Sequence, residues 1–329
     1  MFVVTGGGGF IGSNIVAALD EKQAGAVVVC DRLGDGDKWR NITKRELADI
    51  VMPEHLMAFL DANRNAIKAV FHMGAISSTT EANADLIIAS NFKLSLDIWS
   101  WCAAHDVRLI YASSAATYGD GSQGFDDDAS PAALARLRPL NSYGWSKHLF
   151  DRRVARLVAD GAATPPQWVG LKFFNVYGPN EYHKDDMRSV AAQIHPRAMA
   201  GKAAQLFKSH HPDYTDGGQM RDFVWIEDCV DIALWFLDNA QVSGLFNCGT
   251  GEARSFADLA AAVYHALGKE PLIEYRPTPE AIRTRYQYFT EAAMDRLFTA
   301  GFSRDRLTSL EDGVTQYVQG YLSGPDPYR

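Results

Sequence analysis

Short apolar segments alternate with longer amphipathic segments along the first half of the chain. The apolar runs occupy positions 2–5, 26–30, 69–72, 107–112 and 168–174. Helical periodicity covers positions 11–19, 83–104 and 143–160. Apolar runs that alternate with helices are typical of βαβ units, whose crossovers are right-handed. The pattern therefore predicts an α/β fold with a Rossmann-type, doubly wound parallel sheet.

The pattern loosens after Asn175. Residues 177–220 are rich in Gly, His, Asp and Pro, and they contain one predicted helix at 187–200. A strand followed by a helix is predicted at 223–237, and a short strand at 245–247. We therefore expect the C-terminal part of the chain to pass between the Rossmann domain and a smaller domain.

The length of 329 residues fits one large α/β domain and a smaller second one. We expect residues 1–174 to form the Rossmann domain, with later returns to it near 223–250. Residues 175–222 and 251–329 are expected to form mainly the second, smaller α/β domain, which would bind the substrate.

Charge and cysteine content narrow the class of protein. The formal net charge of −8 argues against a general binder of nucleic acid or of anionic membranes, although a locally basic pocket can still hold an anionic small molecule. The four cysteines show no metal-binding spacing, which predicts reduced thiols and no metal site. Neither a signal peptide nor an apolar membrane span is visible, and we expect a cytoplasmic protein.

A glycine-rich turn joins the first predicted strand to the first predicted helix. Gly7-x-Gly9-x-x-Gly12 satisfies the dinucleotide-binding fingerprint, and Gly6-x-x-Gly9-x-x-Gly12 satisfies a variant of it. One glycine makes the turn, one admits the diphosphate, and one lets the helix pack on the strand. The alternative is a flexible turn, but the position between strand and helix favours a cofactor on the helix N-terminus.

The residues after the second strand bear on which nicotinamide cofactor binds. Asp31 lies about twenty residues beyond the glycines, where an acidic residue holds the adenosine ribose and favours NAD. Arg32 follows directly and Lys38 is near, and these cations favour the 2′-phosphate of NADP. We therefore predict NADP, with NAD as the alternative.

A tyrosine and a lysine lie four residues apart at the start of a predicted helix. Tyr143 and Lys147 therefore share one helical face, where the ammonium is expected to lower the pKa of the phenol. Such a tyrosine can take the proton of a carbinol while its hydride leaves. Ser114 and Thr117 follow a predicted strand, at the edge where ligands bind, and either hydroxyl is a candidate to hold the reacting oxygen.

These motifs, in this order, resemble the extended short-chain dehydrogenase/reductase family of nucleotide-sugar epimerases and dehydratases. The resemblance extends along nearly the whole chain and is carried by residues 71–81, 113–119, 174–184, 221–224, 246–251 and 285–287. Ser-Ser-Thr-Thr-Glu at 77–81 and the pair His183-Lys184 resemble one branch in particular, whose members epimerise C6 of the heptose in an ADP-heptose.

The resemblance implies a mechanism. Bound NADP+ would oxidise C6 of ADP-D-glycero-D-manno-heptose, and the hydride would return to the opposite face, to supply a nucleotide sugar for the lipopolysaccharide core. Tyr143 and Lys184 would be the two acid–base groups. Lys147 would hold the nicotinamide ribose and tune Tyr143, while Ser114 would assist at the reacting oxygen. The family also implies a homo-oligomer, a pentamer in its best-known form.

The resemblance further implies two sets of binding residues. The residues expected to bind the cofactor are Gly6, Gly9, Phe10, Ile11, Gly12, Asp31, Arg32, Lys38, Met73, Gly74, Ala75, Ser77, Asn91, Lys147 and Val176. The residues expected to bind the ADP-sugar are Ser78, Asn175, Asp186, Gln193, Phe207, Lys208, Ser209, Arg221 and Tyr286. Arg221 suits a diphosphate because its guanidinium binds phosphate oxygens bidentately; the alternative is a surface ion pair with Asp222 or Glu227.

The chain departs from the family pattern at several positions. Met73 replaces a glutamate found in some members, and Pro53 falls where a cofactor-binding lysine is expected. Gln193 occupies the position of a substrate histidine and Asp186 that of a substrate serine. Residues 209–219 form a longer segment than the family leads us to expect. These departures bear on sugar specificity more than on the chemistry.

Two other functions remain as alternatives. A nucleotide-sugar 4,6-dehydratase carries acidic groups after the serine, where this chain has Ala115, Ala116 and Thr117, and a 4-epimerase has no need of Lys184 as a second base. A non-catalytic NAD(P)-sensing Rossmann protein would not need the Tyr143–Lys147 pair.

Overall fold

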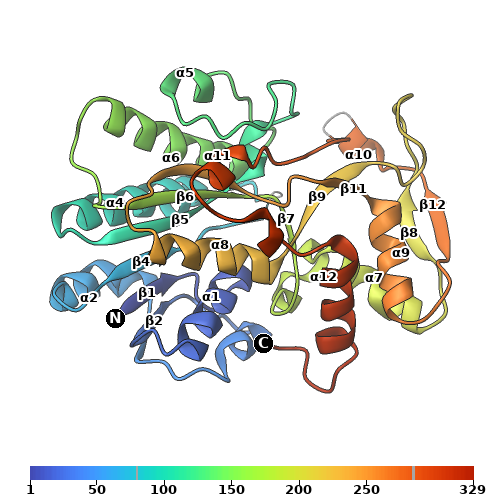
Figure 1. Cartoon of the computed structure of the whole chain (residues 1–329), viewed down its shortest axis with the longest axis horizontal. Helices are drawn as coiled ribbons and strands as arrows, with labels where there is room; N and C mark the ends of the chain where they lie inside the picture. The colour runs from blue at the N-terminus through green and yellow to red at the C-terminus, as the bar shows by residue number, and fades with distance from the viewer. Residues whose placement is uncertain (79–80, 284–285) are drawn as a thin grey trace.

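The computed structural model describes residues 1–78, 81–283 and 286–329, and a seven-stranded parallel sheet forms its larger lobe (Figure 1). The strands run in the order β10-β6-β5-β4-β1-β2-β3. Their bounds are β1 Phe2–Thr5, β2 Val27–Cys30, β3 Asp49–Val51, β4 Ala69–His72, β5 Arg108–Ser114, β6 Trp168–Phe173 and β10 Gly244–Cys248. All neighbouring pairs are parallel. The predicted doubly wound Rossmann-type sheet is confirmed.

Helices cover both faces of this sheet (Figure 1). Helices α1 (Phe10–Glu21) and α8 (Ile226–Asp238) lie on one face, and α4 (Leu94–Ala104) and α6 (Ser142–Ala159) lie on the other. The central strands are buried on both sides, as their continuous apolar runs require. In the described part of the chain, no helix is both long and apolar enough to cross a membrane.

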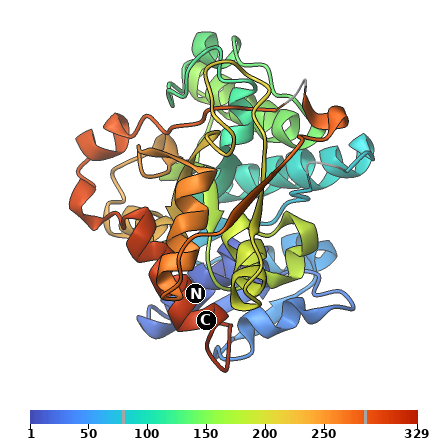
Figure 2. The same cartoon turned by 90° about the vertical axis from the view of Figure 1, so that its right-hand side faces the viewer.

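A smaller lobe follows the sheet and is built around two short sheets. Strands β7 (Asn175–Tyr177), β9 (Met220–Trp225) and β11 (Ala253–Ser255) form one, and β8 (Ala204–Phe207) pairs with β12 (Ile273–Arg276) in the other. Figure 2 shows the helices of this lobe beside one another, and α9 packs between α7 and α12. Their bounds are α7 Val190–Met199, α9 Phe256–Ala266 and α12 Leu310–Tyr317.

Short helices complete the chain. The α-helical ones are α2 Leu56–Asn63, α3 Ala84–Ile87, α5 Pro131–Leu134, α10 Glu280–Arg283 and α11 Asp295–Thr299. The 3-10 and π turns are η1 Asp37–Ile42, η2 Pro53–His55, η3 Ile88–Lys93, η4 Ala115–Tyr118, η5 Tyr182–Met187, η6 Arg304–Arg306 and η7 Val318–Leu322.

The structure differs from the sequence-based expectations in several elements. The helix predicted at 83–104 is interrupted by the π-helical turn η3, so that it forms α3, η3 and α4. Strand β3 and helix α2 were not predicted, because β3 has only three residues and two of them are exposed. Strand β9 belongs to the three-stranded sheet of the smaller lobe, whereas α8 and β10 return to the larger lobe.

Gln167 anchors the amino end of β6. Its side-chain amide donates hydrogen bonds to the carbonyls of Phe236, Asn239 and Val242 at 2.8, 3.0 and 3.1 Å. These carbonyls belong to the end of α8 and to the turn before β10, so one buried side chain joins three consecutive parts of the fold. Gln167 therefore lies at the amino end of β6, remote from the edge formed by the carboxyl ends of the parallel strands.

Candidate active site

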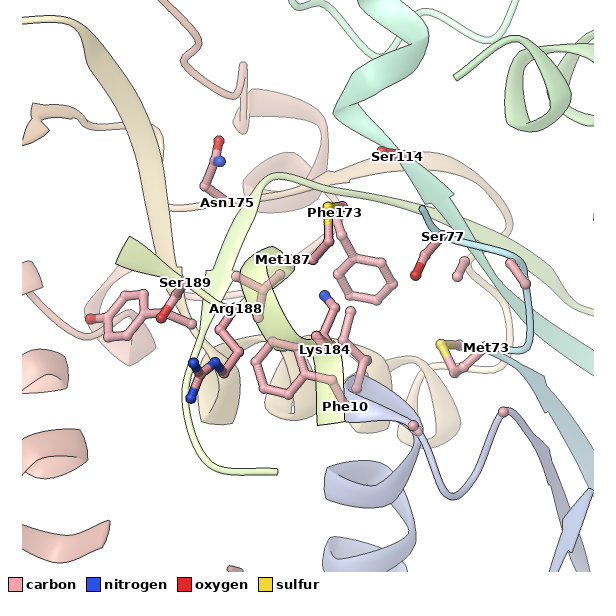
Figure 3. A pocket seen from close by; sticks show the side chains of 18 of the residues that line it. Phe10, Met73, Ser77, Ser114, Phe173, Asn175, Lys184, Met187, Arg188 and Ser189 are labelled. Carbon is pink, nitrogen blue, oxygen red and sulfur yellow. The ribbon is translucent and has the colours of Figure 1, made fainter. Parts of the chain in front are cut away.

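A cavity of about 690 Å³ lies at the carboxyl ends of the central strands. Its lining includes Gly6 after β1, Met73 after β4, Ser114 at the end of β5 and Phe173 at the end of β6. Strands β1 and β4 are neighbours from which the chain proceeds in opposite directions across the sheet, and such a switch point is where ligands bind in α/β folds. Residues of α9 also line the cavity, and η5 contributes Lys184 and Met187 (Figure 3).

The glycine turn leaves no room for larger residues. Gly6 has φ of +66°, and a Cβ there would lie 2.6 Å from Gly74, while a Cβ on Gly12 would lie 2.2 Å from the Gly6 carbonyl oxygen. Helix α1 starts after Gly9 without a side-chain cap and without an acidic residue in its first turn. Because this helix start lines the cavity, it fits the diphosphate of a dinucleotide cofactor.

Asp31 is fully engaged at the end of β2. One carboxylate oxygen accepts from the Gly8 amide at 2.9 Å, and the other accepts from the Arg32 amide and from Lys38 Nζ at 2.8 and 2.6 Å. Asp31 and Lys38 line the cavity, as predicted for cofactor-binding residues. The Arg32 side chain does not line it; it is 64% exposed and pairs with Glu54 at 3.3 Å.

The loop after β4 is held by hydrogen bonds with Thr5 and Asn91. The Thr5 hydroxyl accepts from the Gly74 amide at 3.1 Å. Asn91 accepts from the Ile76 amide at 2.8 Å and donates to the Ile76 carbonyl at 3.0 Å. Asn91 is fully buried and does not line the cavity, so its expected place beside the cofactor is corrected. Asn91 instead fixes the loop after β4. The loop residues that line the cavity are Met73, Gly74, Ala75, Ser77 and Ser78. Thr79 and Thr80 lie outside the described residues.

Ser114, Tyr143 and Lys147 meet at the cavity wall. The Ser114 hydroxyl lies close enough to the phenol of Tyr143 to lower its pKa, and Lys147 Nζ donates to the Ala112 carbonyl at 2.8 Å. Asn141 caps α6 by accepting from the Gly144 amide at 2.8 Å, which fixes where the helix begins.

The electrostatics of this group differ from expectation. Burial raises the pKa of Tyr143, and only the hydrogen bond with Ser114 acts in the opposite direction. The expected lowering of the tyrosine pKa by Lys147 is therefore corrected: the lysine directs its ammonium to the Ala112 carbonyl. Burial lowers the pKa of Lys147 to about 8, although the Asp151 carboxylate opposes that shift.

Lys184 enters the cavity from η5, and its ammonium lies 5.3 Å from the centre of the Phe10 ring (Figure 3). Burial lowers the pKa of this lysine, and Glu181 opposes the shift. Glu181 is itself held by the Ser189 amide and hydroxyl and by the Tyr317 hydroxyl. The lysine is therefore a desolvated amine on an anchored turn, which suits proton transfer.

Arg221 lies next to the cavity among aromatic rings. Its guanidinium lies 5.5 Å from the ring centre of Phe256, which lines the cavity, and 5.5 Å from that of Tyr286. Phe207 packs edge-on against Tyr286, so three residues predicted to bind the substrate form one cluster. The alternative of an ion pair is contradicted, because Asp222 accepts from Thr250, Gly251 and Ala292 and Glu227 pairs with Arg329.

The remaining predicted substrate residues divide into two groups. Asn175 and Ser78 line the cavity. Asp186, Gln193, Lys208 and Ser209 do not: the Gln193 side chain donates to the backbone of Asp186 and Arg188, and the Ser209 amide donates to Asp216. Arg285 lies outside the described residues.

The sequence analysis missed several lining residues. His183, Met187, Arg188 and Ser189 face the cavity, and Figure 3 shows the last three around Lys184. Burial, followed by the charges of Lys38 and Lys184, lowers the pKa of His183 to about 4, so its imidazole is neutral. His183 belongs to a motif that carried the resemblance, whereas residues 187–189 were predicted to begin the helix at 187–200 and instead precede α7, which begins at Val190.

The fold and the glycine turn together are those of a dinucleotide-binding enzyme, and Ser114, Tyr143 and Lys147 line the cavity beside that turn. The sequence matches the NAD dependent epimerase/dehydratase family over residues 2–249. The chain belongs to that family, whose members depend on a nicotinamide cofactor.

Three individual proteins show which members of the family the chain is similar to. The chain is 49% identical to the ADP-L-glycero-D-manno-heptose-6-epimerase of Nitratidesulfovibrio vulgaris strain DP4 over the full length of both proteins. The crystal structure of the ADP-L-glycero-D-manno-heptose-6-epimerase of Helicobacter pylori is similar with a TM-score of 0.75 and 26% identity, over 97% of this chain and 95% of that one. UDP-glucose 4-epimerase of Thermus thermophilus in complex with NAD shares the fold, with a TM-score of 0.73 and 24% identity over 97% of each chain.

The glycine turn gives the first test. Gly12→Ala places a methyl group 2.2 Å from the Gly6 carbonyl oxygen, so we expect it to weaken binding of the nicotinamide cofactor about 10- to 100-fold, as overpacking by roughly 1–3 kcal/mol implies. The matched control is Gly36→Ala, because nothing lies within 4 Å of a Cβ at that position. Titration of both variants by protein fluorescence measures the affinity. Equal affinities in the two variants would contradict the assigned role of the turn.

Proposed function

We propose that this chain epimerises C6 of ADP-D-glycero-D-manno-heptose to give ADP-L-glycero-D-manno-heptose, a nucleotide sugar for the lipopolysaccharide core. The observation that carries the proposal is that Tyr143 and Lys184, both capable of proton transfer, line one cavity from different elements. The 49% identity to a full-length relative with this name supports the same activity. We further propose that the enzyme acts in the cytoplasm as a homo-oligomer.

An anionic substrate is supported by the environment of Arg221. This side chain is 8% exposed, and its guanidinium lies 5.5 Å from each of two aromatic ring centres. It donates to the carbonyls of Met220 and Gln287 but forms no ion pair with a carboxylate among the described residues. A buried guanidinium without a counter-ion is costly, and a diphosphate would supply the missing charge through bidentate hydrogen bonds. Phe207 and Tyr286 adjoin the guanidinium and offer flat apolar surfaces to the nucleotide.

The chemistry begins with loss of the C6 hydroxyl proton as hydride leaves one face of C6. When bound, the nicotinamide cofactor supplies the acceptor for the C6 hydride and returns the same hydride, so the reaction has no net redox change. Ser114 holds the reacting oxygen, and Tyr143 accepts the hydroxyl proton as the alcohol becomes a ketone. Because burial raises the pKa of this phenol, the phenolate that accepts the proton would need a cation beside it, which a bound, oxidised nicotinamide ring would supply. Lys147, fixed to the Ala112 carbonyl, lies one turn from Tyr143 and is placed to hold the nicotinamide ribose.

The second half of the reaction needs a group on another wall of the cavity. Once the ketone has turned within the cavity, hydride arrives at the opposite face of C6, and the oxygen must then regain a proton. Lys184 reaches into the cavity from η5, whereas Ser114 lies at the end of β5 (Figure 3). We assign the second proton transfer to Lys184 because burial lowers its pKa toward the range in which an amine exchanges protons.

We infer NADP as the cofactor from the state of Asp31. Lys38 compensates the charge of this carboxylate at 2.6 Å, and both oxygens already accept hydrogen bonds. An engaged and neutralised aspartate is less suited to ribose hydroxyls and less repulsive toward a 2′-phosphate than a free one. Arg32 is exposed beside this position and held only by a surface pair with Glu54, which is worth little.

Cofactor choice is tested at Lys38. We expect Lys38→Ala to weaken binding of NADP about tenfold or more, the size of one charge-assisted hydrogen bond, and to leave binding of NAD within about threefold. Lys44→Ala is the control, because Lys44 lies beyond the end of η1 and pairs with Asp326 away from the cavity. Calorimetric titration of each cofactor into stripped protein measures the two affinities. An equal loss for both cofactors would leave NAD as the better assignment.

The proposed reaction itself is tested by proton NMR. Purified protein mixed with ADP-D-glycero-D-manno-heptose is expected to form the L-glycero isomer without added cofactor, because the nicotinamide is recycled in place. The spectrum resolves the two isomers directly. If no isomer appears even after NADP+ is added, while a UDP- or GDP-sugar is converted under the same conditions, the chain is a 4-epimerase or dehydratase instead. Bound nicotinamide without turnover of any sugar would favour a cofactor sensor.

The two proposed acid–base groups are tested by substitution. We expect Tyr143→Phe and Lys184→Met each to lower kcat by about 10²- to 10⁴-fold, the usual contribution of a positioned acid or base, while the cofactor remains bound. Lys202→Met, a change at an exposed lysine after α7, serves as the control. Steady-state kinetics separate the effects, and a rise in KM alone for Lys184→Met would assign that lysine to binding.

A further inference from the structure

A fully buried ion pair lies behind the site and takes no part in lining the cavity. Lys172 on β6 and Asp151 on α6 approach within 3.2 Å, and both side chains have no solvent exposure. Burial of two charges is expensive, and apolar residues of the same shape are often as stable or more stable. The pair is therefore poorly explained by stability alone, and its contacts point to another role.

The carboxylate holds the strand that carries the reacting serine. Asp151 accepts a hydrogen bond from the Ser113 hydroxyl at 2.6 Å, and a longer one from the Tyr111 hydroxyl at 3.4 Å. Both donors belong to β5, and Ser113 directly precedes Ser114. The carboxylate thereby ties helix α6 to the carboxyl end of β5.

The ammonium holds the same serine from its other side. Lys172 donates to the Thr117 hydroxyl at 2.5 Å, and Thr117 donates in turn to the Ser114 carbonyl at 2.8 Å. The ammonium also lies 4.6 Å from the centre of the Tyr118 ring in η4. Ser114 is therefore fixed by two neighbours. Asp151 holds Ser113, and Lys172 holds Thr117, which donates to the Ser114 carbonyl.

Helix α6 carries both Asp151 of the pair and the reacting tyrosine. Tyr143, Lys147 and Asp151 are spaced by four residues and share one face of the helix. Lys147 is bonded to the Ala112 carbonyl, so α6 is fastened to β5 at two successive turns beyond Tyr143. The start of the helix approaches η4 so closely that a Cβ on Gly144 would lie 2.7 Å from the Ala116 carbonyl oxygen.

We propose that the Lys172–Asp151 pair is a positioning device that sets the spacing between the Ser114 hydroxyl and the Tyr143 phenol. It joins β5, β6, α6 and η4 at one buried point, and the two reacting hydroxyls lie on the segments that it joins. Neither Lys172 nor Asp151 lines the cavity, so the pair acts through the residues that it holds. The inference rests on the proposed function in that it takes Ser114 and Tyr143 as the reacting pair.

The test separates positioning from stability with a compensated variant. Lys172→Met or Asp151→Leu alone leaves one buried charge without its partner and is expected to destabilise the fold. The double variant Lys172→Met/Asp151→Leu removes both charges with side chains of similar length and branching, so its melting temperature should recover. We nevertheless expect kcat to remain about 100-fold below wild type, the cost of a misplacement of about 1 Å, with KM within about threefold. If the double variant fails to fold, Lys172→Met/Asp151→Asn, which keeps an acceptor for Ser113, takes its place.

The control variant is Gln167→Leu, on the residue that precedes β6 at the end remote from the cavity. It removes three buried hydrogen bonds and should lower the melting temperature without lowering kcat. If the double variant regains both the wild-type melting temperature and the wild-type kcat, the pair has a structural role only and the proposal is overturned.

A second measurement does not depend on the substrate. NMR of protein labelled with ¹³C at the tyrosine Cζ reports the hydrogen bond at the Tyr143 oxygen, and Tyr143→Phe assigns the signal. We expect the signal in the double variant to move to its position in Ser114→Ala, and an unmoved signal would overturn the proposal. If the wild-type protein does not convert ADP-heptose, the proposed function fails on its own, and this signal still decides whether the pair positions the two hydroxyls.

Discussion

The close approach of backbone to backbone at the glycine turn is the constraint on which the site depends. Gly12 lies against the Gly6 carbonyl and Gly6 lies against Gly74, so β1, α1 and the loop after β4 meet with no space for a side chain. Asn41 extends this arrangement by donating to the carbonyls of Gly8 and Asn180 at 2.9 and 3.0 Å. Asn180 begins the turn that leads to Lys184, so the position of the proposed second base follows from the position of the glycines.

Much of this arrangement could be predicted from local sequence, because the strands, the glycine spacing and the Tyr143–Lys147 spacing are short-range patterns. Their meeting at one edge follows from the parallel sheet itself. The role of Asn91 was not predictable, since it lies within the π-helical turn η3 and its partners are the Ile76 backbone, fifteen residues earlier, and the Ser146 hydroxyl on α6. Arg32 follows Asp31 in sequence, yet its side chain forms an ion pair with Glu54. This contact could not be predicted, because Glu54 lies in the unpredicted segment after β3.

Charge is distributed unevenly between the surface and the cavity. The chain carries a formal net charge of −8, yet cations outnumber acids in the cavity lining, which holds Lys38, Lys147, Lys184 and Arg188 against Asp31 and Asp185. Desolvation lowers the pKa of Lys147 and of Lys184, and nearby acids oppose both shifts. The overall charge therefore argues against polyanions as partners, whereas the local charge favours a small anionic ligand, and the sequence composition alone could establish only the first point.

Two buried polar clusters hold two different parts of the cavity wall. Asn41 and Asn180 anchor the turn before Lys184, while Lys172 and Asp151 anchor the strand and helix that carry Ser114 and Tyr143. Buried polar groups cost free energy unless their partners are fully in place, so such clusters tolerate little displacement. The proposed epimerisation needs hydride return at the second face of C6 and proton transfer at the C6 oxygen in both configurations, and rigid placement of both parts of the wall serves that requirement more directly than added stability. The concentration of buried polar contacts around the reacting groups is therefore best understood as the physical basis of their spacing.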